Sequence, residues 1–535
     1  MKRRWVTMLM AMTTAAGAVS LAGCGSTSSG VSTSETSESA DAETRSNDDV
    51  FRVIDNEWYG IDPYQLDSSA VLQQCVSESL FEWDSSTNEL VDGVCTDWTV
   101  SEDGLTATFT VPEGMYYSTG QEVTAEDVVA SIEHGKKVSP YADSYDNIES
   151  MEVDGRQVTF HLTSYRSDML YALCGDFMGI ISKDELDSMT DDELMWGCHP
   201  YGMYSVSNYV SGSEVDLVRN DKYVTNSPLV ENKGAARLAE IDCTFNVEDY
   251  TALESLKNGE VDFLVGITMD DKVDLEGNDA IAVVDNSYPE IDYLELNTTD
   301  GPFADKNVRL AFALLLDREA ACELTDGQAV PAYSMVYDTM QNFSQEAKDY
   351  FQENYANDEE RGYKLLEEAG YTKNSDGYYE KDGEVLELDY YTSNGSVSTI
   401  LGEGLQGQMQ ENGIKVNLNT IDWNYVHEQV QSNDYDVARE GLGWAEPILI
   451  LNRCYYDTDA PTNTEAYSEE VADIAKTVNS EERTKKIYDV QLEMFENMDI
   501  LPFYSEVTWM AYNADLKNVN LAEDGTYSWN DISWE

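Results

Sequence analysis

Residues 413–447 read GIKVNLNTIDWNYVHEQVQSNDYDVAREGLGWAEP and combine strand patterning with charged and aromatic groups. The first part alternates apolar and polar residues at Ile414, Val416 and Leu418, which is the period of a half-buried strand. After a polar segment, Tyr435 to Ala438 predicts a second, shorter strand. The stretch therefore predicts part of a sheet and the connection between two of its strands.

A glycine-spaced loop is expected directly after the second strand. It carries a cation, an indole and a carboxylate, which are Arg439, Trp444 and Glu446. Another aromatic residue, Trp423, comes at the expected end of the first strand. Because binding groups usually sit on loops held by a rigid sheet, these residues predict a binding surface. An edge strand with surface charges and a packed tryptophan fits the same residues.

Strand and helix patterns alternate along much of the chain. Residues 241–267 read as strand, helix and strand, with Asn258 and Gly259 as the helix stop. Residues 385–391 predict a strand, and 398–412 predict a helix that leads into the opening stretch. This alternation predicts an α/β fold. The glycines of 402–407 spell G-x-G-x-x-G, but they lie within the expected helix instead of directly after a strand, which argues against a dinucleotide site.

The charge of the chain excludes some partners. Its 535 residues carry 103 acids and 32 bases, a formal net charge of −71. Nucleic acids and anionic lipids are both bound through Lys and Arg, so neither is expected as an electrostatic partner. The acids alternate with aromatic and apolar residues along the chain, which is typical of a folded protein with an acidic surface.

The first residues have the pattern of an export signal. Lys2, Arg3 and Arg4 precede an apolar segment, Trp5 to Leu21, that is too short and too interrupted for a comfortable membrane span. Leu21-Ala22-Gly23-Cys24 resembles the lipobox of bacterial lipoproteins, which implies a signal peptide over 1–23 and a lipid on Cys24. An ordinary cleaved signal is the alternative. Residues 24–48 are rich in Ser, Thr and acids and predict a disordered tether.

The cysteines and histidines predict no metal site. Seven cysteines remain besides Cys24, and they include no C-x-x-C pair. Cys75–Cys95 and Cys174–Cys198 are conceivable disulfides, and buried free thiols are equally compatible with the sequence. The four histidines have no metal-ligand spacing, and no activated-serine motif is present. We therefore expect neither a cofactor nor an enzyme, with an acid/base hydrolase as the alternative class.

Several motifs resemble one family, the bacterial extracytoplasmic solute-binding proteins of family 5, which serve ATP-driven importers of oligopeptides and dipeptides. The matching pieces are GIKVNL, Trp423, the YDVAR that ends at Arg439, and Gly443-Trp444. Asp103-Gly104-Leu105-Thr106 through Thr124-Ala125-Glu126-Asp127-Val128 is similar to the most characteristic signature of the family. The resemblance covers nearly the whole chain after residue 50.

The resemblance implies a two-lobed fold of the periplasmic-binding-protein type (type II, cluster C) with an extra third sub-domain. Lobe I is expected over 49–80, 190–290 and 505–535. The additional sub-domain is expected over 81–189, and lobe II over 291–504.

The resemblance also implies which residues face the ligand. In the family, an acid just after the Gly-Trp pair holds the peptide amine, and the arginine of YDVAR can take the carboxylate. Here Arg439 matches this pattern. Glu446 is the available acid, but it lies two residues after Trp444 instead of three. The full set implied for the ligand site is Asp67, Tyr141, Tyr288, Trp423, Arg439, Gly443, Trp444, Glu446 and Tyr504. Asp67 can equally cap a helix over 68–80.

The implied function is capture of an oligopeptide between two lobes that close around a hinge, followed by delivery to a permease with its ATPase subunits. The protein is expected to be a monomer, held by its lipid on the extracytoplasmic face of the bacterial cytoplasmic membrane. Other solutes of the same fold, such as an oligosaccharide or a nickel complex, stay open, as does a sensory or adhesive role. Peptide length and side-chain preference are not specified by the sequence.

Overall fold

The structure is a computed structural model, and every structural statement concerns the residues that it describes. These are residues 45–66, 70–84, 87, 89–175, 177–285, 290–338, 340–442, 447–448, 450–451, 465–520 and 528–534.

One mixed sheet has seven strands, and its centre is β1 (Phe51–Ile54). This strand pairs in parallel with β10 on one side and β11 on the other. Helix α5 (Asp249–Lys257) joins those two neighbours, and Gly259 follows it at φ +72°, a conformation that favours glycine. The strand–helix–strand prediction for 241–267 is therefore confirmed. The spatial order is β12 (Ile281–Asp285), β22 (Trp509–Asn513), β11 (Phe263–Ile267), β1, β10 (Glu240–Thr244), β9 (Glu214–Arg219) and β8 (Tyr204–Val210), and α6 (Met269–Asp274) follows β11.

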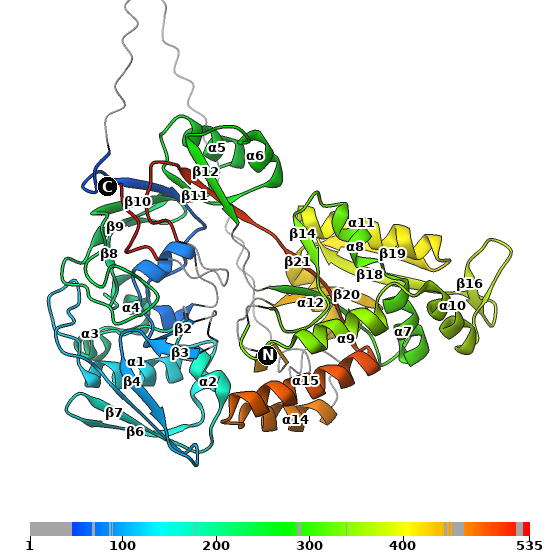
Figure 1. Cartoon of the computed structure of the whole chain (residues 1–535), viewed down its shortest axis with the longest axis horizontal. Helices are drawn as coiled ribbons and strands as arrows, with labels where there is room; N and C mark the ends of the chain where they lie inside the picture. Colours follow the sequence, from blue (N-terminus) through cyan, green and yellow to red (C-terminus); the bar gives the residue numbers. More distant parts are fainter. Residues whose placement is uncertain are drawn as a thin grey trace, which may run out of the picture. The chain divides into compact units, whose positions relative to one another are not determined.

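Smaller sheets and short helices occupy the chain between β1 and β8 (Figure 1). Helix α1 (Ala125–Val138) begins with a capping box, in which Thr124 Oγ1 accepts from the Asp127 N–H at 3.2 Å. The Thr124 N–H donates to the Asp127 carboxylate at 2.8 Å, which completes the capping box. In the described part of the alternative helix over 68–80, the structure has a short 3₁₀ turn, Val71–Cys75. The other elements are 3₁₀ turns at Pro63–Gln65 and Ala142–Tyr145, the hairpin β2 (Phe81–Asp84) and β3 (Glu89–Asp92), the sheet β4 (Thr96–Val100), β5 (Thr106–Thr110), β7 (Gln157–Leu162) and β6 (Ile148–Asp154), and helices α2 (Ser167–Ala172), α3 (Lys183–Ser188) and α4 (Asp191–Gly197).

A second mixed sheet has six strands. Its order is β14 (Ala329–Pro331), β21 (Ile500–Glu506), β13 (Ile291–Leu296), β20 (Val437–Leu442), β18 (Glu387–Ser393) and β19 (Lys415–Ile421). Its helices are α7 (Lys306–Leu315), α8 (Arg318–Glu323), α9 (Gln345–Tyr355), α10 (Glu359–Glu368), α11 (Ser396–Glu411), α12 (Trp423–Ser432), α14 (Glu465–Ala475) and α15 (Ser480–Asn497); a 3₁₀ turn spans Pro302–Ala304, and β15 (Thr372–Lys373), β16 (Tyr379–Lys381) and β17 (Glu384–Val385) form a small separate sheet. In Figure 1, α14 and α15 run side by side.

Each of the two large sheets has its own hydrophobic core. One core takes buried residues from 51–265 and 510–534, and the other takes them from 291–504. The chain passes from the first sheet to the second between β12 and β13, and returns between β21 and β22. Strand β13 therefore follows the first passage and strand β21 precedes the second, and the two strands are direct neighbours in the six-stranded sheet.

Two local predictions for the stretch 413–447 were wrong. Trp423 is the first residue of α12 and does not end a strand. The second strand begins at Val437 and continues to Leu442, so Arg439 lies inside β20 and not on a loop. The glycines of 402–407 lie within α11, as expected.

The described cysteines form no disulfide with one another. Cys75, Cys95, Cys198, Cys243 and Cys322 are free thiols, and neither Cys75–Cys95 nor Cys174–Cys198 is a disulfide. Among the described residues, no helix is both long and apolar enough to cross a membrane.

Candidate functional site

The candidate site lies on three adjacent strands of the six-stranded sheet. The central strand β13 is buried at every position, including the carboxylate of Asp292, whose exposed fraction is 0%. Antiparallel pairing places Asp292 opposite Gly441 of β20 and opposite Tyr504 of β21. Residues paired across an antiparallel sheet point to the same side, so these three positions share one face.

Arg439 supplies the positive charge of this face. It lies two residues before Gly441 on β20, and alternate residues of a strand point to the same side. Its guanidinium forms an ion pair with Asp292, and its Nε donates to the Tyr504 hydroxyl at 3.2 Å. The Tyr504 hydroxyl also lies 3.2 Å from Ser398 Oγ, in the first turn of α11. A continuous polar network thus connects all three strands with the helix above them.

Burial makes this network electrostatically strong, because few water dipoles screen its charges. Burial opposes the charge of Arg439, but Asp292 and Tyr504 outweigh it and hold the pKa of Arg439 above its usual range. Burial raises the pKa of Asp292, and Arg439 works against that shift. Burial also raises the pKa of Tyr504, which stays a neutral hydroxyl. Removal of either member of such a buried pair leaves an uncompensated charge.

Two further carboxylates border the same face. Glu290 lies two residues before Asp292, and Glu506 lies two residues after Tyr504. Both are half-buried, and burial raises the pKa of Glu506, with Arg439 acting against the shift and Glu290 adding to it. Neither glutamate attracted attention in the sequence, because carboxylates are too abundant in so acidic a chain. Only the register of the strands singles them out.

The remaining predicted site residues are distributed as follows. Trp423 is 41% exposed and stacks on His427, with ring centroids 5.8 Å apart. His427 Nδ1 lies 3.4 Å from Glu440, the strand neighbour of Arg439, so this group belongs to the opposite face of β20. Tyr141 is half-buried and its ring contacts Phe177 at 5.0 Å between centroids. Cys24, Asp67, Tyr288, Gly443, Trp444 and Glu446 lie outside the described residues.

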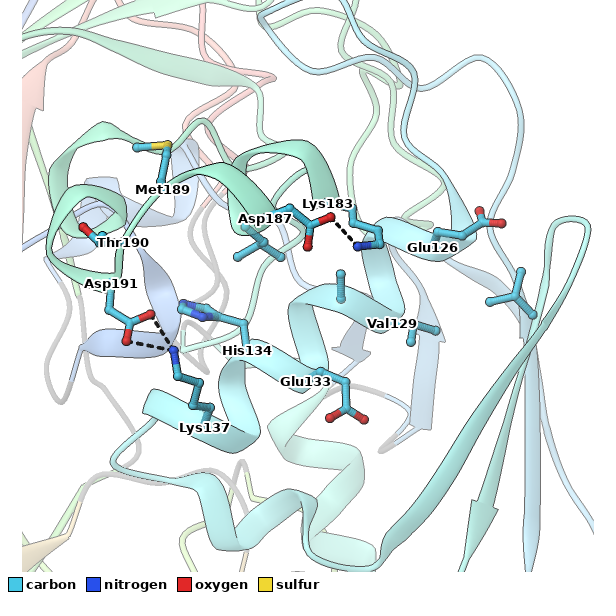
Figure 2. A pocket seen from close by; sticks show the side chains of 13 residues that line it. Glu126, Val129, Glu133, His134, Lys137, Lys183, Asp187, Met189, Thr190 and Asp191 are labelled. Carbon is cyan, nitrogen blue, oxygen red and sulfur yellow. Dashed lines mark hydrogen bonds and ion pairs between the residues drawn. The ribbon is translucent and has the colours of Figure 1, made fainter.

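A separate hollow of about 690 Å³ lies between α1, α3 and the start of α4 (Figure 2). Its two lysines are engaged by neighbouring acids, Lys137 with Asp191 at 2.9 Å and Lys183 with Asp187 at 2.5 Å. His134 is bound to the buried Asp62 at 2.8 Å. None of the predicted ligand-binding residues lines this hollow, so it is distinct from the candidate site.

Two α/β units, each with its own sheet and core, and strands that lead from one sheet to the other define a two-lobed solute-binding protein. The family of bacterial extracellular solute-binding proteins, family 5 Middle, matches residues 89–460, and the chain belongs to this family. Its members are extracellular proteins of bacteria. The resemblance seen in the sequence, and the α/β fold expected from it, are confirmed.

Individual relatives are distant. The oligopeptide-binding protein AppA of Bacillus subtilis is 24% identical over 358 residues, which are 64% of this chain and 63% of AppA. The structure of AppA with a nonapeptide has a TM-score of 0.70 at 18% identity and covers 92% of this chain and 99% of that one. NikA of Brucella suis, in complex with Fe(III)-EDTA, has a TM-score of 0.77 at 18% identity and covers 91% of this chain and 99% of that one. At such identities the structural likeness shows the fold alone.

Proposed function

We propose that this chain captures oligopeptides between its two lobes and delivers them to the permease and ATPase subunits of an ABC importer. The proposal rests on family membership and on relatives that are oligopeptide-binding proteins, AppA of Bacillus subtilis among them. Lobe I comprises 49–80, 190–290 and 505–535, and lobe II comprises 291–504. Residues 81–189 form the additional sub-domain. The protein acts as a monomer that binds its ligand without chemical change.

One structural observation carries the proposal. The polar face of Glu290, Asp292, Tyr504 and Glu506 lies at the ends of β13 and β21, next to both passages of the chain between its sheets. Few connecting residues, at the ends of elements, are what a hinge between domains requires. A charged group placed beside the hinge can contact a ligand that bridges the lobes, so ligand binding and closure become coupled.

The proposed ligand site joins this face with the other family-implied positions. These are Asp67, Tyr141, Tyr288, Arg439, Gly443, Trp444, Glu446 and Tyr504, whereas Trp423 lies with His427 and Glu440 on the opposite face of β20. A receptor for varied peptides should hold the backbone by hydrogen bonds and leave roomy pockets for side chains. The Tyr and Trp rings suit such pockets because they offer apolar area with one polar atom.

Membrane attachment through Cys24 is part of the proposal. A lipid on this residue and the Ser-rich tether of 24–48 would keep the lobes close to the permease. Replacement of Cys24 by Ala should release the protein from washed membranes, whereas Cys95→Ala, at a buried thiol, should not. Membrane retention of Cys24→Ala would contradict the anchor and leave ligand capture intact.

Native mass spectrometry of the protein purified from cells tests the ligand class directly. A series of bound masses that fragment as peptides is expected. A single discrete sugar or metal chelate would overturn peptide capture and leave the solute-binding class in place. Peptides that bind without a change in lobe distance, measured by X-ray scattering, would contradict the hinge mechanism.

A further inference from the structure

The polar face on β13, β20 and β21 carries more negative than positive charge. Its one guanidinium, that of Arg439, forms an ion pair with Asp292. Glu290 and Glu506 form no ion pair with any described residue. Glu290 and Glu506 form no hydrogen bond through their side chains within the described part of the chain, and Asp292 Oδ2 is buried there without a hydrogen-bond partner. A buried carboxylate oxygen left in this state costs free energy unless a donor reaches it.

Because Gly441 has no Cβ, these groups approach the backbone of β20 closely. A Cβ atom built there would lie 2.7 Å from Asp292 Oδ1, 3.1 Å from Glu290 Oε1 and 3.4 Å from Arg439 Nη2. Both carboxylates and the guanidinium therefore converge on the space that a side chain at this position would fill. A glycine inside a strand often marks the close approach of a ligand or another backbone.

The accessible edge of the face is acidic as well. Asp292 and Arg439 are buried, while Glu290 and Glu506 are half-buried above them. Extending the antiparallel register beyond Asp292 and Tyr504 brings Glu290 toward Glu506, and the effect of Glu290 on the pKa of Glu506 agrees with this closeness. A ligand that approaches the face meets these two carboxylates before it meets the guanidinium.

The charge balance decides which ligand group fits. Asp292 already neutralises Arg439, so a ligand carboxylate would have to displace it and would meet repulsion from Glu290 and Glu506. An ammonium group would instead offer several N–H donors to the carboxylates of Glu290 and Glu506, which have no ion-pair or hydrogen-bond partner among the described residues. Charge-assisted bonds of this kind are among the stronger hydrogen bonds in proteins.

We infer that the face formed by Glu290, Asp292 and Glu506 around Gly441 binds a cationic ammonium group of the ligand, and that Arg439 holds Asp292 in place without binding a ligand carboxylate. If the proposed function holds, this group is the α-ammonium of a peptide. The site then fixes the amino end of the peptide beside the hinge and reverses the role that the family pattern implies for Arg439.

The test compares one set of short peptides of mixed length in free, N-acetylated and C-amidated forms, together with 1,5-diaminopentane as an ammonium probe that has no peptide bond. Affinities are measured by calorimetry and by competition in native mass spectrometry. Free and amidated peptides should bind alike, and N-acetylation should weaken binding about tenfold or more.

The test variant carries Glu290→Gln and Glu506→Gln together. The control variant is Glu260→Gln, at an exposed glutamate after α5. The double variant should lose about tenfold in affinity for free peptides and leave N-acetylated peptides unaffected, and the control should match the native protein. Equal binding of free and N-acetylated peptides, or an unchanged double variant, would overturn the ammonium site while peptide capture stood. Binding of the diamine alone, lost in the double variant, would keep the ammonium site and remove peptide capture. No binding of any probe would remove both.

Discussion

Arg439 and Arg318 are both buried arginines that bond to the same strand, yet their surroundings differ. The Nε of Arg439 donates to the Tyr504 hydroxyl, and the Nε of Arg318 donates to the Pro502 carbonyl at 2.7 Å. Arg439 has the carboxylate of Asp292 beside it. Arg318 has aromatic rings instead, with its guanidinium carbon 4.9 Å from the Phe351 ring centroid and 5.9 Å from that of Tyr333.

The two environments shift the pKa in opposite directions. Burial lowers the pKa of Arg318 to about 10, because nearby Tyr333, Cys322 and Asp317 compensate only in part for the lost hydration. For Arg439, Asp292 outweighs the same effect of burial and raises the pKa. Within the described part of the chain, neither Nη atom of Arg318 has a hydrogen-bond partner. The guanidinium of Arg318 is thus held by rings, whereas that of Arg439 is matched to a carboxylate on an acidic face.

The largest expected effect comes from removing Arg439. Arg439→Met leaves Asp292 buried and unpaired, so the free energy of unfolding at pH 7 should fall by about 3–5 kcal/mol. Arg318→Met is the matched control and should change it by no more than about 1 kcal/mol, because the side chain keeps its apolar contacts and two unpartnered donors are lost. Urea unfolding followed by tryptophan fluorescence measures both.

A compensating variant checks the cause. Arg439→Met with Asp292→Asn should recover much of the loss, since no buried charge then remains without a partner. Equal losses for Arg439→Met and Arg318→Met would show that the two arginines play the same structural role.

The difference between these arginines could not be foreseen in the sequence. The alternation of apolar residues located β19, and the family pattern singled out Arg439 and Tyr504. Asp292 was missed because its partner lies far along the chain, and only the register of β13 with β20 brings them together. Glu290 and Glu506 were missed for the same reason, in a chain where an isolated acid carries little information.

The helix α12, by contrast, could have been predicted. Asp422 caps it by accepting from the Asn424 N–H at 3.0 Å, and Val426 and Val430 form its buried stripe at a spacing of one turn. The segment was taken as polar because its remaining residues are solvated. A short helix on a sheet needs few apolar positions, and this explains both the error and the misplacement of Trp423.

Glu78, a buried acid outside the six-stranded sheet, avoids an unpaired buried charge in another way. Glu78 is buried, with Thr225 Oγ1 donating to it at 2.7 Å, and no arginine is among the described groups that act on its pKa. Burial, together with nearby Glu82, raises the pKa of Glu78 to about 8. Where Arg439 and Asp292 neutralise each other, Glu78 keeps its proton.

The consequence is a stability that depends on pH. Because the folded state holds this proton more tightly than the unfolded state, the contribution is complete below pH 4.5 and is lost as the pH rises toward about 8. Several kcal/mol are at stake, at ~1.4 kcal/mol per pKa unit. Glu78→Gln should remove this slope and be the more stable protein above pH 8, as measured by urea unfolding across this range.

Asp55 provides the internal control for that series. Burial raises the pKa of Asp55 to about 6, so part of the slope at lower pH should remain in Glu78→Gln. A variant that keeps the full slope between pH 6 and 8 would show that Glu78 is not the protonated group.

The smallest expected effect concerns the space at Gly441. Gly441→Ala places a methyl group 2.7 Å from Asp292 Oδ1, so the carboxylate must move away from Arg439 or the strand must shift. Overpacking at a buried site of this kind costs about 1–3 kcal/mol. Gly266→Ala is the matched control, since Gly266 is also a strand glycine and a Cβ there meets no atom within 4 Å.

Ligand binding separates the two possible meanings of this glycine. If Gly441 only accommodates the Asp292–Arg439 pair, Gly441→Ala should lower thermal stability and leave the affinity for ligand unchanged. If the acidic face around Gly441 also binds a ligand ammonium group, affinity should fall at temperatures where the variant is fully folded, and Gly266→Ala should match the native protein in both measurements. Loss of affinity in Gly441→Ala, without a comparable loss in Gly266→Ala, would place the acidic face around Arg439 in the ligand site.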